Sequence, residues 1–92
     1  MSELEQYRKE IDAIDQELTR LFESRLNTVL KVGQYKKQHD LPVLDASREQ
    51  AVIEKNVARL TDPQFEPQVT QFYQSMMDIT KDTQTALLEL EN

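Results

Sequence analysis

Apolar residues in the first part of the chain recur at intervals of three and four, which places them on one face of an α-helix. Ser2-Glu3-Leu4-Glu5 fits the capping-box pattern S-x-x-E, and no strong helix breaker follows until Leu41-Pro42. This pattern predicts one continuous helix from about Leu4 to Gln38. Gly33, inside that helix, would allow a neighbouring segment or ligand to approach closely. The apolar positions on the stripe include Leu4, Tyr7, Ile11, Ile14, Leu18 and Leu21.

Two shorter helices are predicted after the Leu41-Pro42 break. Asp45 suits the N-cap of a second helix that runs to about Leu60. Thr61-Asp62-Pro63 ends this helix, and Pro67 suits the first turn of a third helix. We therefore expect residues 1–92 to form a single all-α domain. The apolar positions are Val52, Ile53, Val57 and Leu60 in the second helix, and Val69, Phe72, Tyr73, Met76, Met77, Ile79, Leu87 and Leu88 in the third.

The first predicted helix is too long for a compact chain of this size. At a rise of 1.5 Å per residue, about 35 helical residues span roughly 52 Å. A compact globule of this chain length has a diameter of only about 32 Å. The apolar stripe therefore extends beyond the reach of the two shorter helices, and we expect a second copy of the chain to cover it in a two-fold homodimer.

The composition narrows the possible functions. The chain has 92 residues, one histidine and no cysteine, which leaves no convincing metal site, disulfide or Cys-His nucleophile. It also lacks the glycine loops that bind nucleotides, so we expect neither a metal nor a cofactor. A net charge of −6 argues against nucleic acids and anionic membranes as partners. Without an apolar leader or a membrane-spanning run, a cytoplasmic location is expected.

Basic residues interrupt the apolar stripe of the first helix. At 100° per residue, Arg25 and Lys36 fall in the middle of the apolar sector and Arg8 lies at its edge. Arg25 and Lys36 are separated by about three turns, roughly 16 Å. One interpretation is that they set the register of a helical bundle, or pair with Glu49 or Asp45. The other is that they bind an anionic ligand, because unpaired buried cations are costly.

The second and third helices carry polar residues that also allow two interpretations. In Asp45-Ala46-Ser47-Arg48-Glu49, Asp45 either only caps the helix or belongs to a helix N-terminus beside a ligand. Thr80 and Gln84 lie one turn apart, on the flank of the third apolar stripe. Gln84 is either a satisfied core amide or a neutral hydrogen-bond donor to a ligand.

The candidate residues form an ordered series along the chain. Its members are Arg8 followed by Ile11, Ile14 and Asp15; Arg25; Val32-Gly33 with Lys36; Pro42-Val43 with Asp45-x-x-Arg48-Glu49; and Thr80 with Thr83-Gln84. In order and spacing this series resembles the all-helical class of chorismate mutases, over essentially the whole chain. Each motif is weak alone, and their combination is specific. The resemblance implies an intertwined dimer of three-helix chains.

The resemblance also implies an activity, the cofactor-free pericyclic rearrangement of chorismate to prephenate on the route to phenylalanine and tyrosine. By this resemblance Arg25 and Arg8 bind the two substrate carboxylates, and Arg8 comes from the other subunit. Lys36 contacts a carboxylate and the ether oxygen of the breaking C–O bond. Gln84 donates a hydrogen bond to the same ether oxygen from the opposite side.

The same resemblance assigns the remaining candidates to the other end of the substrate. Glu49 and the backbone of Asp45 hold the substrate hydroxyl, and Arg48 braces this end of the site. Thr80 supplies a hydroxyl contact at a position that is often serine in the family. Val32 packs beneath the substrate ring.

Two other functions remain possible on this fold. An isochorismate-pyruvate lyase shares much of the cationic clamp, although the intact Asp45-x-x-Arg48-Glu49 motif favours the mutase. A non-catalytic helical dimerisation or regulatory module is the alternative from a different class. The presence of Arg8, Arg25, Lys36, Glu49 and Gln84 together weighs against it.

Overall fold

The computed structural model describes residues 2–90 and contains three α-helices, with no strand among those residues. In chain order, α1 spans Glu3–Gln38, α2 spans Ala46–Ala58 and α3 spans Glu66–Leu90. A short 3₁₀ helix, η1 at Pro63–Phe65, leads into α3. The expected all-α fold, with its long first, short second and medium third helix, is confirmed.

The ends of the helices follow from local sequence. The Ser2 hydroxyl accepts from the Glu5 backbone N–H at 3.2 Å, so the predicted N-cap of α1 is correct. At the other end, Leu41 N–H bonds to the Lys36 carbonyl at 2.8 Å while Asp40 adopts a positive φ of 54°. This arrangement is a Schellman-type cap, which turns the chain back over the last turn of α1.

The second helix is two residues shorter than predicted. It ends at Ala58, whereas its apolar pattern extends to Leu60. The backbone N–H groups of Arg59 and Leu60 bond to carbonyls three residues earlier, on Asn56 and Val57. Such bonds tighten the last turn and take these residues out of the α-helix.

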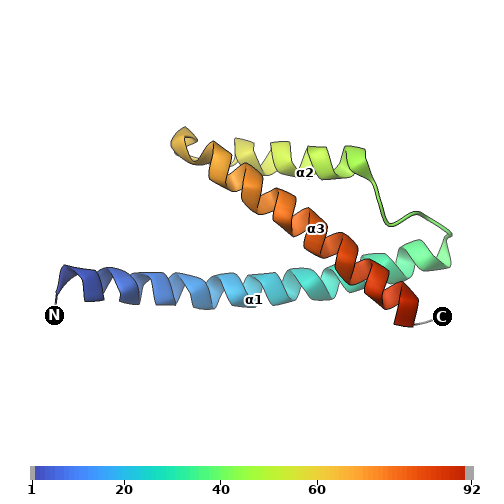
Figure 1. The fold of residues 1–92 in the computed structure, drawn as a ribbon, viewed down its shortest axis with the longest axis horizontal. Coiled ribbons are helices and arrows are strands. Elements are labelled where there is room, and N and C mark those ends of the chain that lie inside the picture. Colours follow the sequence, from blue (N-terminus) through green and yellow to red (C-terminus); the bar gives the residue numbers. More distant parts are fainter. Residues whose placement is uncertain (1, 91–92) are drawn as a thin grey trace.

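The third helix packs against both α1 and α2, and it crosses α1 (Figure 1). The buried core is small: Val52, Met76 and Met77 form a cluster on which Phe22 and Tyr73 pack. These residues join α2, α3 and the middle of α1. The 25-residue helix α3 is thus the element that packs against both of the other helices.

The first half of α1 extends beyond the other two helices (Figure 1). The molecule measures 55 × 27 × 14 Å and has a radius of gyration of 16.6 Å, compared with roughly 12 Å for a compact chain of this length. Six large apolar side chains on this half are 49–58% exposed: Leu4, Tyr7, Ile11, Ile14, Leu18 and Leu21. Among residues 2–90, no helix is long and apolar enough to cross a membrane.

Gly33 lies where α1 meets α3. A Cβ atom at this position would be 3.3 Å from Cγ of Gln84 and 3.3 Å from Cδ2 of Leu87. Such contacts are close, so this glycine permits the two helices to approach, as its place in the sequence suggested. The approach also brings Gln84 beside the α1 backbone.

We predict that Gly33→Leu lowers the free energy of unfolding by about 1–3 kcal/mol, because a bulky side chain would force α1 away from α3. Gly33→Ala is the matched control. Its crowding should be largely offset by a helix-propensity gain of about 1 kcal/mol. Urea denaturation measures both. Equal stability of the leucine variant and the wild type would show that the helices need not approach closely at this position.

Candidate active site

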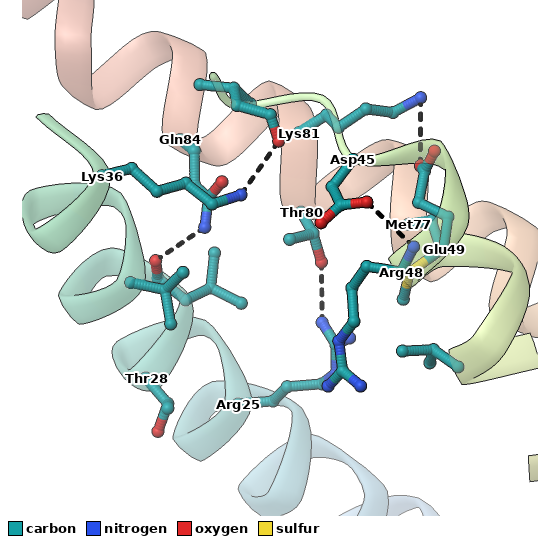
Figure 2. Close-up of a pocket in the computed structure, with 14 residues that line it drawn as sticks. Arg25, Thr28, Lys36, Asp45, Arg48, Glu49, Met77, Thr80, Lys81 and Gln84 are labelled. Carbon is teal, nitrogen blue, oxygen red and sulfur yellow. Dashed lines mark hydrogen bonds and ion pairs between the residues drawn. The ribbon is translucent and has the colours of Figure 1, made fainter. Parts of the chain in front are cut away.

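A cavity of about 270 Å³ lies between the three helices (Figure 2). Eight of the nine predicted site residues line it, and they come from α1, α2, α3 and the turn that precedes α2. The eight are Arg25, Val32, Lys36, Asp45, Arg48, Glu49, Thr80 and Gln84. The fold therefore brings together residues that are up to 59 positions apart in the chain.

The ninth predicted residue, Arg8, does not line the cavity of its own chain. It is exposed on the first half of α1. Arg8 lies 17 residues before Arg25 on the same helix, which corresponds to roughly 25 Å along the axis. A side chain cannot cover that distance, so Arg8 cannot reach this cavity from within the chain.

The two cations of α1 project into the cavity and bind neutral oxygen atoms (Figure 2). Arg25 donates through Nη1 to the Thr80 hydroxyl at 2.7 Å. Lys36 donates through Nζ to the Val43 carbonyl at 3.0 Å, on the segment that the cap of α1 turns back. Because both partners are neutral, neither hydrogen bond offsets the charge of its cation.

Asp45 caps α2, as predicted. Its Oδ1 accepts from the Arg48 backbone N–H at 3.0 Å and from the Ser47 hydroxyl at 2.9 Å. The hydrogen bond from the Arg48 backbone, then that from Ser47, lowers the pKa of Asp45 below its usual value, and the charges of Lys36 and Arg48 add to this effect. The Asp45 carboxylate therefore remains ionised and fixes the start of α2 beside the cavity.

Gln84 is a satisfied core amide that also lines the cavity. It is only 2% exposed, and its Nε2 donates to the Val29 carbonyl of α1 at 3.1 Å, as expected of a satisfied core amide. The same side chain lines the cavity. Because an amide nitrogen carries two hydrogens, a second donor remains beyond the one that Val29 uses.

Thr80 links α3 to Arg25 of α1. Its hydroxyl donates to the Met76 carbonyl at 2.8 Å and accepts from Arg25. With its one hydrogen already used, Thr80 can offer a ligand only acceptor capacity unless these bonds rearrange. Its clear effect in this structure is to orient the Arg25 guanidinium.

Sequence reasoning missed Lys81, which also lines the cavity. Its Nζ lies 3.2 Å from Oε1 of Glu49 and 3.5 Å from Oδ1 of Asp78. The hydrogen bond to Glu49 raises the pKa of Lys81 above its usual value. The only signal in the sequence is the i, i+3 spacing of Asp78 and Lys81, because Glu49 belongs to another helix.

The cavity is more positive than the chain as a whole. Four basic side chains line it, against two acidic ones, although the net charge of the chain is −6. Lys81 pairs with one of those acids, Glu49, and the cap of α2 uses the other, Asp45. This excess of positive charge suits a small molecule with more than one carboxylate. Within residues 2–90, no group of three or more histidine, cysteine or acidic side chains could hold a metal ion.

Comparison with known proteins identifies the family. The family model for chorismate mutase type II matches residues 7–85, most of the chain. The chain belongs to the chorismate mutase type II family. No solved structure matches it with significance.

Two curated relatives of this chorismate mutase family member are larger proteins. The T-protein of Haemophilus influenzae is 44% identical over 54 residues, which cover 59% of this chain and 14% of that protein. The bifunctional chorismate mutase/prephenate dehydratase of Aquifex aeolicus is 40% identical over 55 residues, which cover 60% of this chain and 15% of the relative. Each match thus includes only a small part of the relative.

We predict that the Asp45 carboxylate makes the free energy of unfolding depend on pH in the acid range. Because folding lowers its pKa below 3.8, its contribution is complete above that value and is lost as the pH falls through the pKa of the folded state. Asp45→Asn keeps a capping oxygen but has no carboxylate to titrate. Thermal melts at several pH values should show the wild type more stable than the variant at neutral pH, with a difference that shrinks in acid. A pH-independent difference would contradict this assignment.

Proposed function

We propose that this chain converts chorismate to prephenate. The main support is the juxtaposition of Arg25 and Lys36 with the buried Gln84 amide around one cavity, in a member of the chorismate mutase type II family. One of the two relatives carries chorismate mutase in its name. Two cations and a neutral donor are the groups that a dicarboxylate with a developing oxyanion requires.

The reaction needs little chemistry from the protein. It is unimolecular, with one C–O bond breaking as a C–C bond forms, so no nucleophile or external proton is required. The substrate must be held in a compact, chair-like conformer while negative charge builds on its ether oxygen. Catalysis therefore comes from restricted conformation and from fixed charges and dipoles, which the cavity supplies.

Three side chains would act on the carboxylates and the ether oxygen. Arg25 binds one carboxylate through its planar guanidinium, and Thr80 holds it at a defined angle. Lys36 exchanges its bond with the Val43 carbonyl for a carboxylate and the ether oxygen. Gln84 donates the second hydrogen of its amide to the same oxygen. Its bond to Val29 fixes the direction of that donor.

The N-terminal end of α2 would bind the rest of the substrate. Glu49 and the backbone of Asp45 hold the hydroxyl, and Arg48 braces this end of the molecule. Val32, which is 42% exposed and lines the cavity, packs beneath the ring. Thr80 would act on the substrate mainly by holding the Arg25 guanidinium in place.

We further propose that the active protein is a homodimer whose two sites are shared. The apolar stripe on the first half of α1 is about half exposed, and a second copy of the chain offers an identical stripe that would cover it. Arg8 lies at the edge of this stripe, so an antiparallel partner could carry it along α1 to the other chain's cavity. Arg8 of each subunit would then complete the site of its partner by binding the second carboxylate.

A single assay tests the proposed function. Purified protein is incubated with chorismate, and both the loss of chorismate and the formation of prephenate are measured. Prephenate as the product supports the proposal. Salicylate formed from isochorismate, without prephenate from chorismate, would indicate the lyase. No turnover of either compound by a folded protein would favour a non-catalytic module.

We predict that Gln84→Glu makes the activity depend strongly on pH. Gln84 is buried, so a glutamate there would have a raised pKa and would donate a hydrogen bond only while protonated. The variant should work in acid and fail as the pH rises, because its carboxylate would repel the developing oxyanion. The kcat of the wild type should not show this loss. Identical pH profiles would argue against Gln84 at the ether oxygen.

We predict that Arg8→Ala and Lys36→Ala complement each other. Each variant alone should be nearly inactive. Lys36→Ala removes a donor to the ether oxygen, a loss that typically lowers kcat by about 10²–10³. Arg8→Ala removes the cation that binds one substrate carboxylate. After the two chains are unfolded together and refolded, about half the dimers should be mixed, each with one intact site. Activity should recover to about a quarter of the wild type. Mixed dimers without activity would show that Arg8 does not act across the interface.

A further inference from the structure

Lys81 bridges α3 to α2 at the rim of the proposed active site. Figure 2 shows its side chain extending from α3 toward the Glu49 carboxylate on α2. The Nζ to Oε1 distance is 3.2 Å, and the two side chains are 33% and 22% exposed. This contact is thus better shielded from solvent than the surface pair of Arg20 and Glu17, whose side chains are 64% and 65% exposed.

Glu49 has an electrostatic difficulty if it holds the substrate hydroxyl. It is a carboxylate in a cavity that must accept a molecule with two carboxylates, and Asp45 lines the same cavity. Like charges in a partly enclosed site repel more strongly than in water. A glutamate side chain also has several rotatable bonds, and fixing it for one hydrogen bond costs conformational entropy.

We propose that Lys81 is a positioning residue, which holds the Glu49 carboxylate in place and neutralises it so that Glu49 can accept the hydroxyl of a dianionic substrate. This inference rests on the proposed function of the cavity. Lys81 binds Oε1 of Glu49, and we assign the hydroxyl to the second oxygen, Oε2. The Lys81 ammonium is charged at neutral pH, as for any lysine with an ordinary pKa, and the contact with Glu49 raises its pKa further.

Asp78 helps to fix the lysine from the opposite side. Its Oδ1 lies 3.5 Å from Lys81 Nζ, one turn earlier on α3, but its side chain is 71% exposed. Such an exposed i, i+3 pair contributes little by itself. The functional contact of Lys81 is therefore the one with Glu49. A substitution of Asp78 removes the other contact alone, so it tests the two contacts separately.

The test is the steady-state kinetics of Lys81→Met with chorismate. Methionine has a similar length and helix propensity, so the variant should fold, and circular dichroism checks that it does. Loss of the ammonium should raise KM about five-fold, the upper end for a partly exposed ion pair. The kcat should stay within about two-fold, because the hydroxyl contact is made in the ground state and in the transition state alike.

Three further variants separate positioning from other roles. Lys81→Arg restores a cation that can reach the carboxylate, and should bring KM back to within about two-fold of the wild type. Lys55→Met makes the same charge change on an exposed lysine of α2, and should leave KM unchanged. Asp78→Asn should also change KM by less than about two-fold.

A double-mutant cycle with Glu49→Gln gives the decisive comparison. If Lys81 acts through Glu49, adding Lys81→Met to Glu49→Gln should raise KM by less than about two-fold further. Additive effects would show that Lys81 acts independently of Glu49 and would overturn the inference. A KM of Lys81→Met equal to the wild type, failure of Lys81→Arg to restore KM, or an equal effect of Asp78→Asn would overturn it too. If the wild type itself does not consume chorismate, that result contradicts the proposed function, and it is distinct from every outcome that concerns Lys81 alone.

Discussion

The close approach of α3 to α1 at Gly33 is the contact on which the rest of this structure depends. A Cβ there would lie only 3.3 Å from Gln84 and Leu87, so the glycine sets how near the two helices come. That distance lets Gln84 reach the Val29 carbonyl and, one turn earlier, lets Thr80 meet Arg25. The packing of the helices and the geometry of the cavity therefore have the same origin.

The second constraint is electrostatic. A chain with a net charge of −6 concentrates four basic side chains around one cavity, and such convergence costs free energy in the absence of an anion. Arg25 and Lys36 offset part of that cost with hydrogen bonds to neutral oxygens. These bonds also orient the cations before a ligand arrives, which reduces the entropy lost on binding.

The small buried core is consistent with the proposed association of two copies of the chain. Among residues 2–90, the buried apolar cluster consists of Val52, Met76 and Met77, and Val29 is buried as well, while the stripe on the first half of α1 is about half exposed. The length of α1 fits the proposed dimer, in which this helix would pack within its own chain and also reach a neighbour's site. In the proposed dimer, one α1 would supply Arg25 and Lys36 to one site and Arg8 to the other.

The sequence by itself determined the helices and most of the candidate site. Periodicity and caps depend on residues close together in the chain, so α1 and the Asp45 cap were predictable, and the interruption of the stripe marked Arg25 and Lys36. The interpretation of Gln84 needed the resemblance to a family as well as the pattern. Only the tertiary structure decided which partners these side chains take. The pairing of Lys81 with Glu49 depends on how α3 crosses α2, and helix periodicity carries no information about the register between two helices far apart in sequence.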